Sequence, residues 1–369
     1  MERDELGAWL RLLLTPGVGN ATARQLLAAC GGPHQVFEQS PAVLASLVGP
    51  RLADALLTPP PEWTSQLNNT WAWLQADPAH HLLSLADAAY PPDLLQMPDP
   101  PTLLFVHGSL AALAHTPKVA VVGSRNPTPQ GQLNAREFAR ALGQAGACVV
   151  SGLALGVDGA AHEGALDAGA RTIAVVGTGL DRVYPARHKA LAHRIAASGA
   201  LLSEYPLGTP PMAPNFPKRN RLIAALGQGT LVVEAALQSG SLITARLAVD
   251  LGRDVFAIPG SIHSPQSRGC HALIRQGAKL VESAQDVLEE LRVLSPAAAV
   301  TAIDAPPEVA ATGDAALLAA LGHDPVSLDA LQARTGWPTA QLQAALLELE
   351  LVGEVGRLPG GLFQRLGRA

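Results

Sequence analysis

The sequence predicts an α/β protein built on an extended Rossmann-like, doubly wound, mostly parallel sheet, with a small all-α N-terminal domain and a C-terminal winged-helix domain. Three observations predict this fold class. From residue 102 onward, short runs rich in valine, isoleucine and alanine alternate with amphipathic stretches long enough for crossover helices. These runs lack polar alternation, which is typical of parallel strands covered on both faces. Helical patterns without such runs precede and follow this region.

The first block, residues 1–100, is rich in alanine and leucine, and Leu10, Leu13 and Leu14 recur at the spacing of one helix face. Thr15-Pro16-Gly17-Val18-Gly19 stands between two short helical stretches and resembles a helix-hairpin-helix turn. Glycine amides in such a turn can hold a DNA phosphate, although a purely structural hairpin fits the same residues. We predict an all-α domain here.

The sheet domain is predicted over residues 101–294, because eight strand-like runs fall there, at 102–106, 119–122, 148–150, 172–176, 200–202, 230–233, 255–258 and 279–281. Residues 295–313 are rich in proline and alanine and nearly uncharged, which predicts a linker. Residues 314–369 then read as helix-turn-helix followed by a hairpin around Gly360-Gly361. The predicted recognition helix, 339–349, carries no Lys or Arg, so this domain is expected to contact protein rather than read DNA.

Composition excludes several functional classes. The 369 residues carry a net charge of −5, but the segment from Lys118 to Glu282 holds 17 basic and 10 acidic residues, so the middle is basic and the ends are acidic. Three widely spaced cysteines support neither a disulfide framework nor a zinc knuckle. No apolar run is long enough to span a bilayer. We expect a soluble cytoplasmic protein with no membrane partner.

Glycine and serine follow the predicted strands at the positions where a phosphate would bind. These positions are Gly123-Ser124-Arg125, Ser151-Gly152, Gly177-Thr178-Gly179 and Ser239-Gly240-Ser241. Carboxyl ends of parallel strands meet at one edge of the sheet, where ligands bind in a crevice, and glycines there let backbone amides approach an anion. Any single glycine could be ordinary turn chemistry. Four on one edge favour a phosphate-binding crevice.

The segment Asn215-Phe216-Pro217-Lys218-Arg219-Asn220-Arg221 gives the sharpest local signal. Asn215 is a candidate N-cap, so the cations would crowd a helix N-terminus, where they oppose the dipole unless an anion sits there. Phe216 offers a ring on which a base could stack. The alternative is a solvated helix end with Phe216 in the core. We favour a nucleic-acid phosphate site.

Other chemistry finds little support. No GxGxxG or GxxxxGK[ST] fingerprint occurs, so a dinucleotide cofactor or P-loop NTPase is disfavoured and no cofactor is expected. Asp158 and His162 are four residues apart, but the HExxH motif of metalloproteases is not present, because Leu166 stands where its second His belongs. An Asp at the start of a helix that pairs with His162 is the simpler interpretation. Arg182, Arg187 and Lys189 are either crevice cations or surface ion pairs. We predict no metal site and no catalytic residues.

Four segments in this order resemble the DprA/Smf DNA-processing family. They are Val121-Val122-Gly123-Ser124-Arg125, the run from Ser151 to His162, Asn215-Phe216-Pro217-Lys218-Arg219-Asn220-Arg221, and the run from Gly252 to Gly260. The resemblance spans about residues 90–291. The flanking domains resemble the family's helix-hairpin-helix or SAM-like N-terminus and its winged-helix C-terminus less specifically.

The resemblance implies a recombination mediator, not an enzyme, that binds and protects incoming single-stranded DNA and loads the RecA recombinase during natural transformation. It also implies a homodimer formed through the Rossmann domain. Carried over residue by residue, it places ten positions at the DNA, namely Ser124, Arg125, Gly152, Arg187, Phe216, Lys218, Arg219, Asn220, Arg221 and Gly240. His162 is a family hallmark whose role the sequence does not give.

Two alternatives remain open at this point. The Rossmann variant also resembles nucleotide-processing phosphoribohydrolases of the LOG type, which use a PGGxGT loop followed by a Glu. Here Gly227-Gln228-Gly229-Thr230 precedes Glu234, but the Pro-Gly-Gly is absent. A pure partner-binding scaffold with a vestigial crevice is the other alternative, and it predicts that Arg125→Ala leaves function intact.

Overall fold

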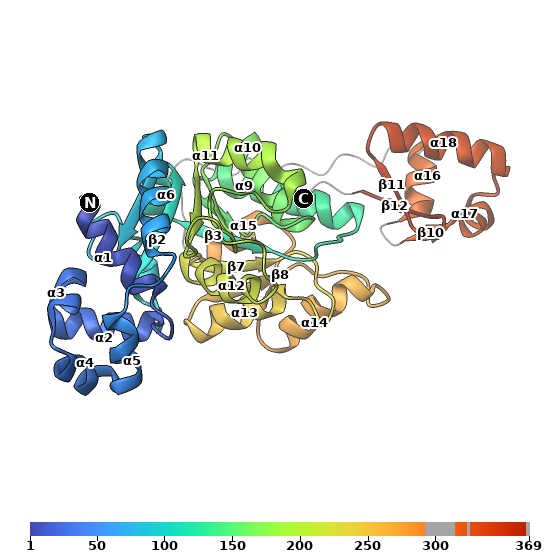
Figure 1. Ribbon diagram of the computed structural model, residues 1–369. Coiled ribbons are helices and arrows are strands. Elements are labelled where there is room, and N and C mark those ends of the chain that lie inside the picture. The colour runs from blue at the N-terminus through green and yellow to red at the C-terminus, as the bar shows by residue number, and fades with distance from the viewer. Residues whose placement is uncertain (292–313, 323–324, 367–369) are drawn as a thin grey trace.

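The computed structural model describes residues 1–291, 314–322 and 325–366 (Figure 1). The predicted linker, 295–313, lies outside the described residues. Figure 1 shows the N-terminal helices and the winged-helix unit on opposite sides of a central sheet domain. Six helices form the N-terminal part, namely α1 (Arg3–Leu14), α2 (Asn20–Cys30), α3 (Pro33–Glu38), α4 (Pro41–Val48), α5 (Pro50–Leu57) and α6 (Trp63–Ala76).

The central sheet has nine strands in the order β1-β2-β6-β5-β4-β3-β7-β8-β9. The strands from β6 to β9 in this order pair in parallel, and β1 and β2 add an antiparallel edge. Their bounds are β1 (His80–Ser84), β2 (Leu103–Gly108), β3 (Lys118–Val122), β4 (Cys148–Ser151), β5 (Thr172–Val175), β6 (Ala200–Ser203), β7 (Gly229–Val232), β8 (Asp254–Ala257) and β9 (Lys279–Leu280). The chain winds from β3 toward β6 in one direction and from β7 toward β9 in the other. The topological switch point therefore lies between β3 and β7.

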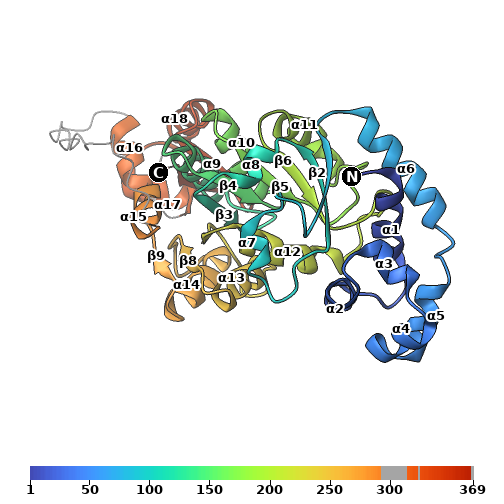
Figure 2. The ribbon, with the colours of Figure 1, turned by 90° about the vertical axis from the view of Figure 1, so that its left-hand side faces the viewer.

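Helices cover both faces of this sheet (Figures 1 and 2). They are α7 (Pro92–Leu95), α8 (Leu110–Ala114), α9 (Pro129–Gln144), α10 (Val157–Asp167), α11 (Lys189–Ser198), α12 (Asn215–Leu226), α13 (Ser241–Asp250), α14 (Arg268–Arg275) and α15 (Ala284–Glu290), with short 3₁₀ turns η1 (Ala186–His188) and η2 (Pro265–Ser267). Val119 and Val121 of β3 pack into one core with Phe138 of α9, whereas Ala120 and Val122 pack into the other with helix α12. This period-two division explains why the central strands show no alternation of polar and apolar residues.

Strand β1 departs from the sequence-based prediction, because it lies inside the block predicted to be all-helical. His80–Ser84 pairs antiparallel with β2 at the sheet edge, and Leu82 and Leu83 are both buried. The predicted all-α region therefore ends at α6. A five-residue edge strand carries little local pattern of its own, because its place is fixed by pairing with a strand some 20 residues later.

The C-terminal unit has the predicted helix-turn-helix and hairpin. It consists of α16 (Asp314–Leu321), β10 (Val326–Ser327), α17 (Leu328–Thr335), α18 (Thr339–Leu351), β11 (Val355–Leu358) and β12 (Leu362–Arg365), with a three-stranded sheet in the order β10-β12-β11. Leu331, Leu346 and Phe363 contribute to its separate core. Within the described part of the chain, none of the helices is both long and apolar enough to cross a membrane.

Candidate nucleic-acid interface

A cavity of about 520 Å³ opens at the carboxyl ends of β3 and β7, at the switch point of the sheet. Its walls come from the loop after β3, the start of α10, the first turns of α12 and the segment that leads into α13. The lining residues include Gly123, Ser124, Arg125, Asn126, Asp158, Phe216, Arg219, Asn220, Gln238, Ser239, Gly240, Ser241 and Thr244. Segments up to about 120 residues apart in the sequence thus meet at one edge, as the motif positions predicted.

Arg125 is the exposed cation that lines this cavity. Its side chain is exposed, and it forms no ion pair or hydrogen bond with another described residue. Its guanidinium carbon lies 5.6 Å from the centroid of the Phe216 ring. The Phe216 ring in turn lies 5.6 Å from the ring of Tyr184, which is 48% exposed. A free guanidinium beside two accessible rings is suited to a phosphate with a neighbouring base.

Arg219 also lines the cavity, but its side chain is buried and forms its hydrogen bonds within the protein. It is only 3% exposed, and its Nη1 donates hydrogen bonds to the carbonyl oxygens of Gly152 and Val175. Burial lowers the pKa of Arg219 to about 10, although the nearby Asp158 carboxyl opposes this shift. Burial raises the pKa of Asp158, and Arg219 opposes that shift in turn. Each of the two buried charges therefore stabilises the other.

Gly152 leaves the space that the Arg219 guanidinium occupies. A Cβ on Gly152 would lie 2.7 Å from both Cζ and Nη2 of Arg219, so the guanidinium occupies the space that a side chain would need. The Gly152 amide donates to Asp158 Oδ2 at 3.2 Å, and the Ala154 amide donates to the same oxygen at 3.3 Å. Gly152 was predicted to let DNA approach the backbone. Instead, the structure places the Arg219 side chain there, and Gly152 does not line the cavity.

Arg221 lies outside the cavity, and its guanidinium is also bound within the protein. Its Nη2 forms an ion pair with Glu204, whose side chain is 5% exposed, and its Nη1 donates to the Asp99 carbonyl oxygen at 2.7 Å. Arg221 therefore anchors α12 to β6 and to the segment before β2. The Arg-Asn-Arg motif thus contains two arginines bound within the protein, on different sides of one helix.

The remaining predicted residues fall into two groups. Ser124, Asn220 and Gly240 line the cavity, and the Ser124 hydroxyl accepts from the Asn126 amide at 3.1 Å. Lys218 and Arg187 are exposed and do not line it. The Lys218 ammonium lies 5.8 Å from the Tyr205 ring centroid, and Arg187 is in η1, three residues after Tyr184. Arg187 therefore stands in the loop that carries Tyr184, and Lys218 stands in the first turn of α12.

Two local predictions are wrong. Asn215 is not the N-cap of α12, because the helix begins at Asn215 itself and its Nδ2 donates to the Gly177 carbonyl oxygen at 3.0 Å. His162 does not pair with Asp158. Its Nδ1 lies 2.7 Å from the Thr172 hydroxyl, and because that hydroxyl donates to the Val149 carbonyl oxygen, Nδ1 must be the donor to Thr172. Burial lowers the pKa of His162 to about 3, so the ring is a neutral core residue.

Sequence reasoning missed several residues of the site. Tyr184 contacts Phe216, and Asp158 binds the loop from Gly152 to Ala154 and faces Arg219. Gln238 also lines the cavity, next to Ser239, which the pattern at the strand ends predicted. Only Tyr184 carried a usable signal, as an aromatic residue in a loop at the same sheet edge.

The fold and the cavity together define a class of protein: a Rossmann-like domain with a basic, polar crevice at its switch point and an appended winged helix. Residues 81–292 match the family model of DNA recombination-mediator protein A, and residues 301–361 match that of the DprA winged helix domain. The chain therefore belongs to the DprA/Smf family of DNA-processing recombination mediators, which confirms the resemblance and the predicted fold class.

Individual relatives agree with this assignment. Protein Smf of Escherichia coli is 44% identical over 308 residues, 82% of each chain, and DNA processing protein DprA of Streptococcus pneumoniae is 51% identical over 207 residues, 56% of this chain and 73% of that protein. The X-ray structure of Streptococcus pneumoniae DprA matches with a TM-score of 0.68 and 40% identity over 77% of this chain and 97% of that chain. DNA processing protein A of Helicobacter pylori, whose structure is described as giving insight into its single-stranded DNA binding mode, matches with a TM-score of 0.53 and 34% identity over 57% of this chain and 96% of that chain.

Proposed function

We propose that this chain binds single-stranded DNA at the switch-point cavity and acts as a recombination mediator that protects incoming DNA and loads RecA during natural transformation. The observation that carries the proposal is Arg125, an exposed cation that pairs with none of the described residues and lies 5.6 Å from the Phe216 ring in a cavity lined by glycine and serine. A positive groove with aromatic rings is how proteins bind single strands without reading their sequence. The single-stranded DNA binding described for the Helicobacter pylori relative supports the same function.

The ten predicted residues divide into direct and indirect roles in this proposal. Five of the six that line the cavity are assigned to direct contact with DNA, namely Ser124, Arg125, Phe216, Asn220 and Gly240. Lys218 and Arg187, which are exposed and lie outside the cavity, are assigned to phosphates farther along the strand. Arg219, Arg221 and Gly152 act as positioning residues, because their polar groups are bound within the protein. Tyr184 joins Phe216 as a second surface on which a base can stack.

A phosphoribohydrolase of the LOG type would need Glu234 available to a nucleotide. Here the Glu234 carboxylate accepts from the Thr128 amide at 2.9 Å and from the Thr128 hydroxyl at 2.6 Å, at the start of α9. Its side chain also packs against Gly131, where a Cβ would collide with it. These contacts favour a structural role for Glu234 and a binding function for the cavity.

The test compares binding of labelled oligo-dT by the intact chain and by Arg125→Ala across a salt series. For single strands, log Kobs falls with log salt concentration by about 0.7 for each neutralised phosphate, so losing one contact should make the slope about 0.7 shallower. Phe216→Ala should weaken binding by about 1–3 kcal/mol with little change in slope, because stacking is not ionic.

Arg171→Ala is the matched control. Arg171 is an exposed arginine directly before β5, at the edge of the sheet opposite the cavity, and its removal changes the net charge equally. It should leave the slope unchanged. Equal slopes for the intact chain, Arg125→Ala and Arg171→Ala would contradict the proposed site. Cleavage of nucleoside monophosphates without oligonucleotide binding would favour a phosphoribohydrolase.

The mediator role requires a further measurement. RecA is added to oligonucleotide already covered by a single-strand-binding protein, and its DNA-dependent ATPase rate reports loading. We expect the intact chain to accelerate loading and Arg125→Ala to do so much less, while sedimentation of both shows a homodimer. A monomeric chain would contradict the proposed dimer, and unchanged loading by Arg125→Ala would favour a partner-binding scaffold.

A further inference from the structure

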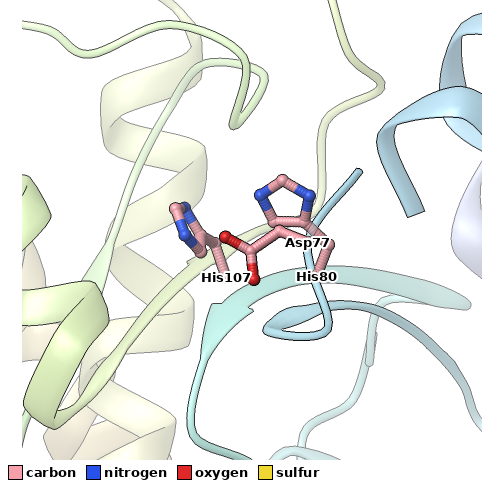
Figure 3. Close-up of side chains that lie close together, drawn as sticks. All are labelled: Asp77, His80 and His107. Atoms are coloured by element: carbon pink, nitrogen blue, oxygen red, sulfur yellow. The ribbon is translucent and has the colours of Figure 1, made fainter. Parts of the chain in front are cut away.

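Two histidines and one aspartate meet at the outer edge of the sheet, away from the DNA cavity. His80 begins β1 and stands directly opposite His107 of β2 in the antiparallel register. Asp77 lies in the turn between α6 and β1. Figure 3 shows the Asp77 carboxylate and the two imidazole rings close together, and one ligand atom of each lies within 4.8 Å of the others. All three side chains are half-buried.

The His80 ring is held in one tautomer. Its Nδ1 lies 2.7 Å from the Trp73 carbonyl oxygen, and because a carbonyl only accepts, Nδ1 carries the proton. The lone pair of the neutral ring is therefore on Nε2. Trp73 also stacks on this ring with centroids 3.9 Å apart and planes 12° apart. A histidine that donates one ring N–H to a backbone carbonyl is the usual arrangement of a metal ligand, because that bond orients the other nitrogen.

Asp77 is held by the turn, and no described Lys or Arg pairs with it. Its Oδ1 accepts from the Ala79 amide at 2.8 Å, which fixes the carboxylate at the start of β1. Among the residues that the structure describes, no Lys or Arg forms an ion pair with Asp77, and no donor is bound to Oδ2. An anionic oxygen free of cations beside two imidazoles offers a ligand set that a divalent metal ion would complete.

We propose that Asp77, His80 and His107 bind a divalent transition-metal ion, with Zn²⁺ the best match to two imidazoles and a carboxylate. Zn²⁺ takes such ligands at about 2.0–2.2 Å in tetrahedral geometry, so ligand atoms that now lie within 4.8 Å of one another must close to roughly 3.3–3.5 Å when the ion binds. Three protein ligands leave the fourth position to water. The ion would join the α6–β1 turn to β2, and thus the N-terminal helices to the sheet.

The proposed metal site is separate from the DNA cavity. His107 pairs with Leu201 near the beginning of β6, whereas the cavity lies at the carboxyl ends of the parallel strands. Loss of metal should therefore leave oligo-dT binding unchanged, which gives a readout independent of the proposed function. It also makes oligo-dT binding a check that a variant is folded.

The experiment titrates Co²⁺ into the full chain after treatment with a chelator. We expect one equivalent to produce the intense visible d–d bands of tetrahedral Co²⁺, and one equivalent of Zn²⁺ to abolish them. His107→Gln should weaken Co²⁺ binding by more than about 100-fold, since even the loss of a partner outside the ligand set costs about 10–100-fold. His81→Gln is the matched control, because successive residues of a strand point to opposite faces and His81 is next to His80 in β1.

Asp77→Asn removes the anionic ligand but keeps the fold, because the Asn amide oxygen still accepts the hydrogen bond from the Ala79 amide. It should abolish the tetrahedral bands and remove the rise in Tm that Zn²⁺ gives the wild type. The proposal is overturned if the wild type binds no Co²⁺ stoichiometrically or gives only the weak octahedral spectrum. It is equally overturned if His81→Gln loses as much affinity as His107→Gln while both bind oligo-dT.

Discussion

Gly152→Ala tests whether the cavity depends on the space that this glycine leaves for Arg219. The new Cβ would lie 2.7 Å from Cζ of the Arg219 side chain, about an ångström less than ordinary carbon contacts allow. The guanidinium must then leave the carbonyl oxygens of Gly152 and Val175. Each hydrogen bond to a charged group is worth about 1.5–3 kcal/mol, so losing both costs about 3–6 kcal/mol.

A smaller gain offsets part of this cost. The φ of Gly152 lies outside the left-handed region, so alanine can adopt its backbone conformation and restricts the unfolded chain, a gain of about 0.4–1 kcal/mol. The expected net loss in the free energy of unfolding is about 2–5 kcal/mol. For a domain of this size, that lowers Tm by about 4–20 °C. Urea titration gives the free energy, and calorimetry gives Tm.

A double-mutant cycle decides whether the clash with Arg219 is the cause. In an Arg219→Met background the guanidinium is gone, so Gly152→Ala should cost less than about 1 kcal/mol. Gly240→Ala is a control on the same cavity, since its Cβ would meet no atom within 4 Å, and it should change stability by less than about 0.5 kcal/mol. The reasoning is refuted if Gly152→Ala costs the same with and without Arg219.

Three further predictions concern the core. Asp93→Asn removes the partner of Lys118, which is 1% exposed and 2.8 Å from the Asp93 carboxylate, and should cost about 3–5 kcal/mol in urea unfolding. Gly164→Ala would place a Cβ 2.8 Å from the Arg136 carbonyl carbon, so α9 and α10 must separate at a cost of about 1–3 kcal/mol. His162 has a pKa of about 3 when folded against about 6.5 when unfolded, so only the unfolded chain binds its proton between these values. Stability should fall as pH drops below 6.5, and His162→Gln should make that fall shallower by up to about 1.4 kcal/mol per pH unit in acid titrations followed by urea unfolding.

The central strands could be predicted because burial on both faces leaves its mark in the local sequence. The run predicted at 119–122 appears as Lys118–Val122, and that at 172–176 as Thr172–Val175. Strand β1 has no comparable mark, since it has only five residues and begins with two half-buried histidines, so that its sequence resembles many loops. The strand ends located the cavity because the topology of a parallel sheet brings them to one edge.

The separate roles of the arginines could not be predicted from the sequence. Arg219 and Arg221 are two residues apart, which places them about 200° apart around α12. One meets backbone carbonyl oxygens from β5 and the loop after β4, and the other meets Glu204 after β6. Those partners are set by helix packing against strands 15 to 70 residues earlier, and the motif itself does not record them.

The buried Arg219 contributes to the electrostatics of the cavity even though its hydrogen bonds are formed within the protein. Repulsion from Arg125 contributes to lowering the pKa of Arg219, so the two cations raise each other's energy across the cavity that both line. Asp158 lines the same cavity, and it raises the pKa of Arg219 by more than Arg125 lowers it, so burial accounts for the net decrease. A phosphate entering the cavity would interact favourably with both guanidiniums and relieve their repulsion. Asp158 thus compensates part of the buried charge of Arg219, and the exposed Arg125 supplies the direct contact to an anionic ligand.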